Sequence, residues 1–253
     1  MINIKSLIGV LKNNNSDFFT GVPDSVLKEL SNFLRNKNKK KHIIATSEGS
    51  AVSIGIGYYL STKKMPVIYM QNSGLSNALN PLISIAHKKV YSIPLILIIG
   101  WRGSPGIKDE PQHKVKGEIT EEILKLLNIK YTIVKSKTDL VKFDKQIKLA
   151  KKNKSAVACL IEKGTLEKNN KKVIKKDYYK LDKKQFLKTL LENIPYNSKI
   201  ISSTGYNSRE LMYLRNKYKL KKSSDFYMVG GMGHTSSVAL GYSLSSKKKT
   251  ICI

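Results

Sequence analysis

Short runs of apolar residues alternate along the chain with longer segments in which apolar residues recur every three or four positions. The short runs are expected to be strands, at 18–20, 42–45, 67–70, 95–99, 131–134 and 156–161. They are apolar on both faces, which is typical of strands in a parallel sheet covered by helices on each side. Residues 1–162 are therefore predicted to form one doubly wound parallel α/β domain.

The pattern changes at 163–184, where Lys, Asn, Asp and Tyr dominate and apolar periodicity is almost absent. This segment is predicted to be an exposed linker. A second α/β pattern follows over 185–253, with helices expected at 185–193, at 208–215 and from about His234, and strands at 199–202, 226–229 and 250–253. Three parallel strands bury too little surface for a finished domain, so we expect this half to be incomplete.

The share of hydrophobic residues is that of a globular protein, but the net charge is unusually high. Of the 253 residues, 41% are hydrophobic and 25% charged, and the net charge is +28. Only four of the 46 basic residues are arginine, and the lysines stand in short runs. A nucleic-acid-binding surface usually gathers arginine and aromatic residues, so a solvated lysine-rich surface is the preferred interpretation and no nucleic-acid partner is expected.

Cysteine usage and the apolar runs bear on the cellular setting. Cys159 and Cys252 each lie in an apolar run without the spacing of a zinc site, and both are expected to be buried reduced thiols. No leader pattern opens the chain, and its longest apolar stretch, 93–101, is too short to cross a bilayer. A cytoplasmic protein with no membrane partner is therefore expected.

Candidate chemistry gathers where the predicted strands end. The chain has no GxGxxG motif after its first strand, no phosphate-binding GxxxxGK[ST] loop and no GxSxG motif. Polar and turn-forming residues instead follow the strands, at 21–25, 47–49, 71–74 and 100–103. In an open parallel sheet these loops share one edge, where ligands bind.

Glu48 belongs to this edge, and two interpretations of it stay open. It can be an acid in the first turn of a glycine-rich helix, favoured by the helix dipole. It can also be a partly buried carboxyl group with a raised pKa that shares a proton with a ligand nitrogen.

Several of these runs closely resemble the phosphonopyruvate decarboxylase family of thiamine diphosphate enzymes. The matching segments are 19–25, 48–51, 69–75, 100–113, 208–211 and 225–234, of which 100–113 is the most specific. The resemblance spans nearly the whole chain. It implies the thiamine diphosphate-binding fold, with a complete pyrimidine-binding domain in 1–162 and the first part of a diphosphate-binding domain in 185–253.

The resemblance assigns roles to residues that match the family's motifs. Glu48 takes the place of the activating glutamate, which hydrogen-bonds N1′ of the cofactor's aminopyrimidine. Gly230 is expected to accept a hydrogen bond from the 4′-amino group, and Met232 to hold the bent cofactor. The residues expected at the diphosphate are Gly205, Asn207 and Ser208. As alternatives, Met232 fills a gap in a glycine-rich turn, and Asn207 caps a helix.

The implied reaction is the non-oxidative decarboxylation of 3-phosphonopyruvate to phosphonoacetaldehyde, as in the biosynthesis of 2-aminoethylphosphonate. Holding this small anionic 2-oxo acid calls for cationic and amide donors. The candidate substrate residues are Asp24, Gln71, Asn72, Arg102, Lys108, Gln112, His113 and His234. As an alternative, Arg102 forms an ion pair with Asp109 or Glu110 that orders the loop. Two rival functions stay open: decarboxylation of sulfopyruvate, and a non-catalytic chain that acts only in subunit association.

The chain departs from the family pattern at two places. Ser47 stands where Asn is expected before the activating glutamate. The family's Gly-Asp-Gly motif, with an Asn about a helix further on, is absent and would begin just after Ile253. That motif supplies the oxygen ligands of Mg²⁺, and we expect no metal ligands within this chain. We therefore expect a C-terminally truncated chain that binds the cofactor poorly alone, and the resemblance implies at least a homodimer.

Overall fold

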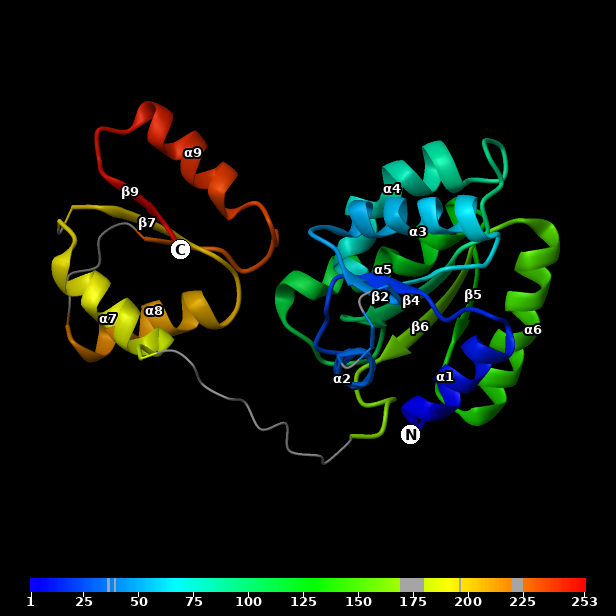
Figure 1. Ribbon diagram of the computed structural model, residues 1–253. Helices are drawn as coiled ribbons and strands as arrows, with labels where there is room; N and C mark the ends of the chain where they lie inside the picture. The colour runs from blue at the N-terminus through cyan, green and yellow to red at the C-terminus, as the bar shows by residue number, and fades with distance from the viewer. Residues whose placement is uncertain (36, 39, 169–179, 196, 220–224) are drawn as a thin grey trace. The chain divides into compact units, whose positions relative to one another are not determined.

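The computed structural model describes the chain except residues 36, 39, 169–179, 196 and 220–224 (Figure 1). The chain divides into two compact units, Met1–Lys171 and Lys172–Ile253. Part of the predicted linker, 169–179, lies outside the described residues.

The described part of unit 1 contains one parallel sheet of six strands. The strands are β1 (Phe19–Gly21), β2 (His42–Ile44), β3 (Val67–Gln71), β4 (Ile96–Trp101), β5 (Lys130–Ile133) and β6 (Val157–Glu162). Their order across the sheet is β2-β1-β3-β4-β6-β5, and every pairing is parallel. All six predicted strands are confirmed to within one residue at each end except at the end of β4, and so is the doubly wound α/β class.

Helices cover both faces of this sheet (Figure 1). One face carries α1 (Ile4–Asn13), α2 (Lys28–Leu34) and α6 (Lys137–Asn153), and the other carries α3 (Glu48–Thr62), α4 (Leu75–Pro81) and α5 (Pro111–Leu126). A 3₁₀ turn, η1 (Asn72–Gly74), precedes α4, and a π-helical turn, η2 (Leu82–Ala86), follows it.

The apolar runs explain why both faces are covered. On β3, Val67 and Tyr69 join the cluster under α1, α2 and α6, whereas Ile68 and Met70 join the cluster under α3, α4 and α5. All six residues of β4 are buried. A strand that is buried on both faces, such as β4, presents its polar groups mainly in the loops at its ends.

Unit 2 repeats the α/β pattern on a smaller scale. Its described elements are α7 (Lys183–Asn193), β7 (Lys199–Ser202), α8 (Tyr206–Lys217), β8 (Phe226–Tyr227), α9 (Thr235–Ser245) and β9 (Thr250–Cys252), and the strands form a parallel sheet in the order β8-β7-β9. Each predicted helix and strand of this half is present. The nearly buried Arg215 and Asp225 side chains form an ion pair, with Nε and Oδ2 3.0 Å apart.

The expectation for one of the two cysteines differs from the structure. Cys159 is buried, which raises the pKa of its thiol, but Cys252 is exposed on β9, so the prediction that it is buried is wrong. In the described residues β9 pairs only with β7, which leaves its other edge open.

The start of the predicted linker is exposed at Lys163 and Gly164 but buried at Thr165 and Leu166. Leu166 is buried in the core of unit 1, and Ile2 forms a parallel bridge with it. Its burial completes the apolar cluster around α1. Within the described ranges, no helix is both long and apolar enough to cross a membrane.

Candidate active site

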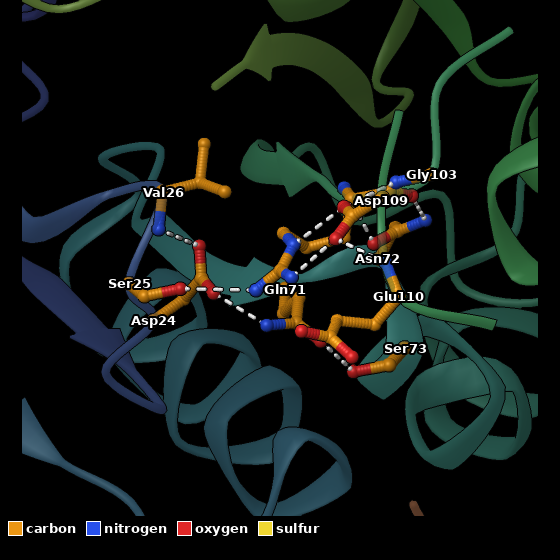
Figure 2. Close-up of polar contacts among 10 residues, drawn as sticks. Asp24, Ser25, Val26, Gln71, Asn72, Ser73, Gly103, Asp109 and Glu110 are labelled. Carbon is orange, nitrogen blue, oxygen red and sulfur yellow. Dashed lines mark hydrogen bonds and ion pairs between the residues drawn. The ribbon is translucent and has the colours of Figure 1, made fainter. Parts of the chain in front are cut away.

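The carboxyl ends of β1, β3 and β4 bring polar side chains together at one edge of the unit 1 sheet (Figure 2). Gln71, the last residue of β3, donates from Nε2 to Asp24 Oδ1 at 2.6 Å. Ser73 donates from Oγ to Gln71 Oε1 at 2.6 Å. The edge thus contains a continuous hydrogen-bonded row from the loop after β1 to the turn after β3.

Asp24 is held by backbone as well as by Gln71. Its Oδ2 accepts from the backbone N–H groups of Val26 at 2.9 Å and Leu27 at 3.1 Å. A Cβ at Gly100 would lie 2.2 Å from Oδ2, so only glycine leaves room for this carboxyl group. Burial raises the pKa of Asp24, although the hydrogen bonds it accepts act in the opposite direction.

Glu48 lies at the start of α3, and only 5% of the residue is exposed. Ser47 caps the helix by accepting from the Ser50 N–H at 3.2 Å. Asn77 donates from Nδ2 to Glu48 Oε2 at 3.0 Å, whereas Oε1 accepts no hydrogen bond from the described residues. The carboxyl group lies against Gly74, where a Cβ would be 2.3 Å from Oε1. Glu48 is thus both a first-turn acid and a buried carboxyl group with one oxygen available.

Arg102 forms an ion pair with Asp109 within its own loop. It donates from Nε to Asp109 Oδ2 at 2.6 Å, and its Nη2 pairs with Oδ1 of the same carboxylate. Its Nη1 donates to Ser25 Oγ at 3.4 Å. The Arg102 guanidinium holds the pKa of Asp109 well below its usual range. The structure therefore shows the alternative arrangement for Arg102, an ion pair that orders the loop.

Asn72 links three elements rather than facing the edge. From Nδ2 it donates to Arg102 O at 2.9 Å, Lys116 O at 3.2 Å and Thr120 Oγ1 at 3.0 Å. Its Oδ1 accepts from the Arg102 N–H at 3.0 Å. Both polar atoms of this buried amide are thus engaged by the loop after β4 and by α5. Its geometry favours a positioning role over the expected contact with substrate.

α5 packs closely against the end of β4 and forms one boundary of the edge. Trp101 donates from Nε1 to Gly117 O at 3.0 Å. A Cβ at Gly117 would lie 1.7 Å from the Gly103 carbonyl oxygen, so the two backbones nearly touch. This contact fixes the place of the first turns of α5, which carry Gln112 and His113.

The remaining unit 1 candidates differ in exposure. His113 is half-buried, and its buried Nδ1 has no hydrogen-bond partner among the described residues. Burial, followed by the charge of Arg102, lowers the pKa of His113, so its neutral form is favoured near pH 7. Gln112 is half-buried, and Lys108 is exposed in the loop before α5.

The diphosphate candidates follow β7 in unit 2. Gly205 has φ +83° at the start of α8, a conformation that glycine adopts readily. Asn207 lies inside α8, whose N-cap is Gly205 without a side-chain cap, and it donates from Nδ2 to Ser203 Oγ at 2.8 Å. Ser208 is buried, and its Oγ lies 2.7 Å from both Ser202 Oγ and Ser203 O.

The other candidates of unit 2 follow β8. Gly230 is half-buried, and His234 is exposed just before α9. Met232 is 48% exposed, so in this unit its side chain does not fill a gap in the core. The predicted residues thus fall into two sets, one at a strand edge of each unit.

Several residues of the edge were missed by the sequence reasoning. Asn77, Thr120 and Lys116 contact predicted site residues, but they lie inside helices where sequence pattern gives no signal of a contact. No group of three or more His, Cys, Asp or Glu side chains in the described residues could hold a metal ion.

Comparison with known proteins identifies relatives for both halves of the chain. The family model described as "Thiamine pyrophosphate enzyme, N-terminal TPP binding domain" matches residues 4–124. Phosphonopyruvate decarboxylase from Streptomyces viridochromogenes is 29% identical over 270 aligned positions, which cover 100% of this chain and 66% of the relative. The chain therefore spans just under two thirds of that relative's length.

Two subunits of another enzyme also match. Sulfopyruvate decarboxylase subunit alpha from Methanococcus maripaludis is 35% identical over 129 positions, covering 51% of this chain and 75% of the relative. Sulfopyruvate decarboxylase subunit beta from Methanocaldococcus jannaschii is 36% identical over 67 positions, covering 26% of this chain and 33% of the relative.

Proposed function

Because the chain belongs to the thiamine diphosphate-dependent decarboxylase family, we propose that it decarboxylates 3-phosphonopyruvate to phosphonoacetaldehyde and carbon dioxide. The observation that carries the proposal is Glu48, a buried carboxyl group at the carboxyl edge of a parallel sheet with Oε1 available to a ligand. The relative that matches the entire chain supports the choice of substrate.

The residues at the two edges fit thiamine diphosphate. When bound, this cofactor supplies an electron sink for the charge left as carbon dioxide departs. We assign Glu48 Oε1 to a ring nitrogen of the cofactor, with which it shares a proton. Asn77, by donating to Oε2, fixes the carboxyl group so that Oε1 faces away from it.

In unit 2 the assigned contacts follow β7 and β8. The turn at Gly205, together with Asn207 and Ser208, offers amide and hydroxyl groups to the diphosphate. Gly230 offers a backbone carbonyl group, and the exposed Met232 offers an apolar side chain to the cofactor's rings. These roles stay proposals, since they depend on the family resemblance.

Proton transfer and substrate binding are assigned to the edge of unit 1. Asp24, whose pKa burial raises, is assigned to substrate binding beside Gln71, and the neutral imidazole of His113 can accept or return a proton. Gln112 remains a candidate hydrogen-bond donor, Lys108 a candidate for charge pairing and His234 a candidate to face the substrate. The described residues offer no ligand set for Mg²⁺, so no step is assigned to a metal ion.

Sulfopyruvate is the second candidate substrate. Its sulfonate closely resembles a phosphonate in shape but carries less charge, and the subunit alpha relative is the more similar in sequence over the part that matches. For either substrate we propose a cytoplasmic assembly of at least two copies. The sulfopyruvate relatives, which are separate alpha and beta subunits, make a second kind of chain the alternative partner.

The direct test incubates the purified protein with thiamine diphosphate, Mg²⁺ and either 3-phosphonopyruvate or sulfopyruvate. Released carbon dioxide and the aldehyde are measured, and calorimetry measures cofactor binding. We expect turnover of phosphonopyruvate to exceed that of sulfopyruvate. The opposite preference would favour the second candidate. Absence of turnover with both, together with absence of cofactor binding, would leave only the role in subunit association.

A further inference from the structure

We infer that Lys116 on α5 is the cation that binds the distal phosphonate or sulfonate group of the substrate, an inference that rests on the proposed function. Lys116 is half-buried and donates from Nζ to the Ser73 carbonyl oxygen at 3.3 Å. An ammonium group has three donors, so two remain for a tetrahedral oxyanion.

The ion pair of Arg102 makes Lys116 the better candidate for binding an anion. Arg102 is the arginine of the edge, but its Nε and Nη2 atoms are engaged by Asp109, whose side chain is only 5% exposed, and its Nη1 atom donates to Ser25 Oγ. Breaking such a pair to bind substrate would leave a buried carboxylate without its partner, at a large free-energy cost. Arg102 is therefore better suited to ordering the loop than to binding an anion.

Lys116 has no such competing partner. In the part of the chain that the structure describes, no carboxylate lies within 4.0 Å of its Nζ atom. Its helix neighbours at three and four residues' distance are Gln112, His113, Ile119 and Thr120, none of them acidic. Its charge is therefore not neutralised by an ion pair.

The contact with Ser73 places this charge at the candidate site. Ser73 bonds Gln71, which bonds Asp24, and the next residue, Gly74, lies against the Glu48 carboxyl group. The Lys116 ammonium group thus contacts the same turn that packs against Glu48. A substrate carboxylate and phosphonate at this edge would meet several carboxyl groups, so a compensating cation is needed there.

The base of the Lys116 side chain is fixed. Asn72 donates to the Lys116 carbonyl oxygen at 3.2 Å, and the close approach of Gly117 to Gly103 holds the same turn of α5. A fixed Cα restricts the region that the ammonium group can reach, which favours binding at one place. Lys114 lies two residues earlier on the same helix but is exposed, which makes it the matched control.

The kinetic test compares wild type with Lys116→Gln, Lys116→Arg and Lys114→Gln, after thermal unfolding shows that each variant is folded. We expect Lys116→Gln to raise the KM for the preferred substrate about 10- to 100-fold with little change in kcat, because a charge-assisted hydrogen bond is lost. Lys116→Arg should restore most of the affinity, and Lys114→Gln should behave as wild type. An unchanged KM in Lys116→Gln overturns the inference while leaving the proposed function intact.

A second measurement does not depend on turnover. The wild-type chain is acetylated in the presence and absence of methylphosphonate, and mass spectrometry gives the extent of modification at each lysine. Protection of Lys116 beyond that of Lys114 supports the anion site, even if the wild type decarboxylates neither substrate and the proposed function fails. Equal protection of the two lysines overturns the inference.

Discussion

At Glu48 a single substitution can remove the proposed proton sharing while keeping the shape of the side chain. Glu48→Gln keeps the size and the bond from Asn77, but an amide cannot share a proton with a ring nitrogen. We expect kcat to fall by about 10²- to 10⁴-fold, the range that positioned proton transfer contributes. The exposed acid Glu118, replaced by Gln in the same assay, is the control. Near-normal turnover in Glu48→Gln would contradict the assigned role.

Asp109 provides a pH-dependent test of the Arg102 ion pair. Because Arg102 lowers the pKa of Asp109 in the folded protein, the pair adds stability that is fully present above the unfolded pKa of about 4 and is lost progressively as pH falls from that value through the lower folded-state pKa. Asp109→Asn should therefore lower the free energy of unfolding at pH 7 by about 1–3 kcal/mol, and by less on acidification. Urea unfolding over a pH series measures the difference.

The exposed ion pair of Asp17 with Lys41 gives the matching control. Asp17→Asn should change the free energy of unfolding by less than about 1 kcal/mol, because solvent screens surface pairs. A loss in Asp109→Asn that stays constant from neutral to acid pH would show that packing, rather than charge, explains the effect.

At the residue scale, the sequence predicts which residues can carry the chemistry better than it predicts which side chains contact one another. The ion pair of Arg102 was foreseeable as an alternative because its acid lies seven positions away in the same loop. The role of Asn72 was not, because its partners Lys116 and Thr120 are 44 and 48 positions away and only the fold brings them together. An amide in a loop at a ligand-binding edge has the same sequence pattern whether it faces a substrate or a helix.

At the scale of elements, two helical glycines should respond in opposite directions to alanine. Gly117→Ala places a Cβ 1.7 Å from the Gly103 carbonyl oxygen, so α5 must move away from β4. We expect it to lower the free energy of unfolding by about 2–4 kcal/mol, at the upper end for overpacking, since backbone must shift. Gly57→Ala in α3 meets no atom within 4 Å and should stabilise by up to about 1 kcal/mol.

Chemical denaturation of the two glycine variants against wild type measures this contrast. Equal effects of the same sign would mean that α5 does not approach β4 as closely as described. For Gly117→Ala, a loss of substrate binding is also expected, because the turn that carries Lys116 would move with the helix.

The elements themselves were largely predictable. Short apolar runs identified every strand that the structure describes, because a short run that is apolar on both faces is typical of a buried parallel strand. The two-residue β8 and the π-helical turn at Leu82–Ala86 were not foreseen in this form. The length of a short strand and the hydrogen-bond pattern of a helical turn depend on tertiary packing. The burial of Leu166 beside Ile2 depends on it as well.

At the scale of the molecule, the net charge of +28 should act against folding. Most lysines lie on the surface, and self-repulsion among them is screened as salt is added. Raising the salt concentration from about 0.1 M to about 1 M shortens the screening length from about 10 Å to about 3 Å. We expect the melting temperature to rise over this range, equally in NaCl and KCl. A fall in both salts would indicate that attractive ion pairs dominate.

The strand edge of each unit shows what a single chain reveals about where candidate site residues lie. Each set of candidates follows the carboxyl end of a strand, so the topology alone identified the loops from which they come. Which side chains of those loops face a ligand depends on contacts such as those of Asn72 and Arg102. Periodicity and spacing carry no information about such contacts.

The junction of β4 and α5 carries its own optical probe. Trp101 is the single tryptophan of the chain, is 3% exposed, and bonds the backbone of Gly117 where the two elements meet. Tryptophan emission from this protein therefore originates at one position beside the candidate site. It can report the loosening of that junction or the arrival of a ligand without any attached label, and unit 2, which has no tryptophan, adds nothing to the signal when tryptophan is excited selectively.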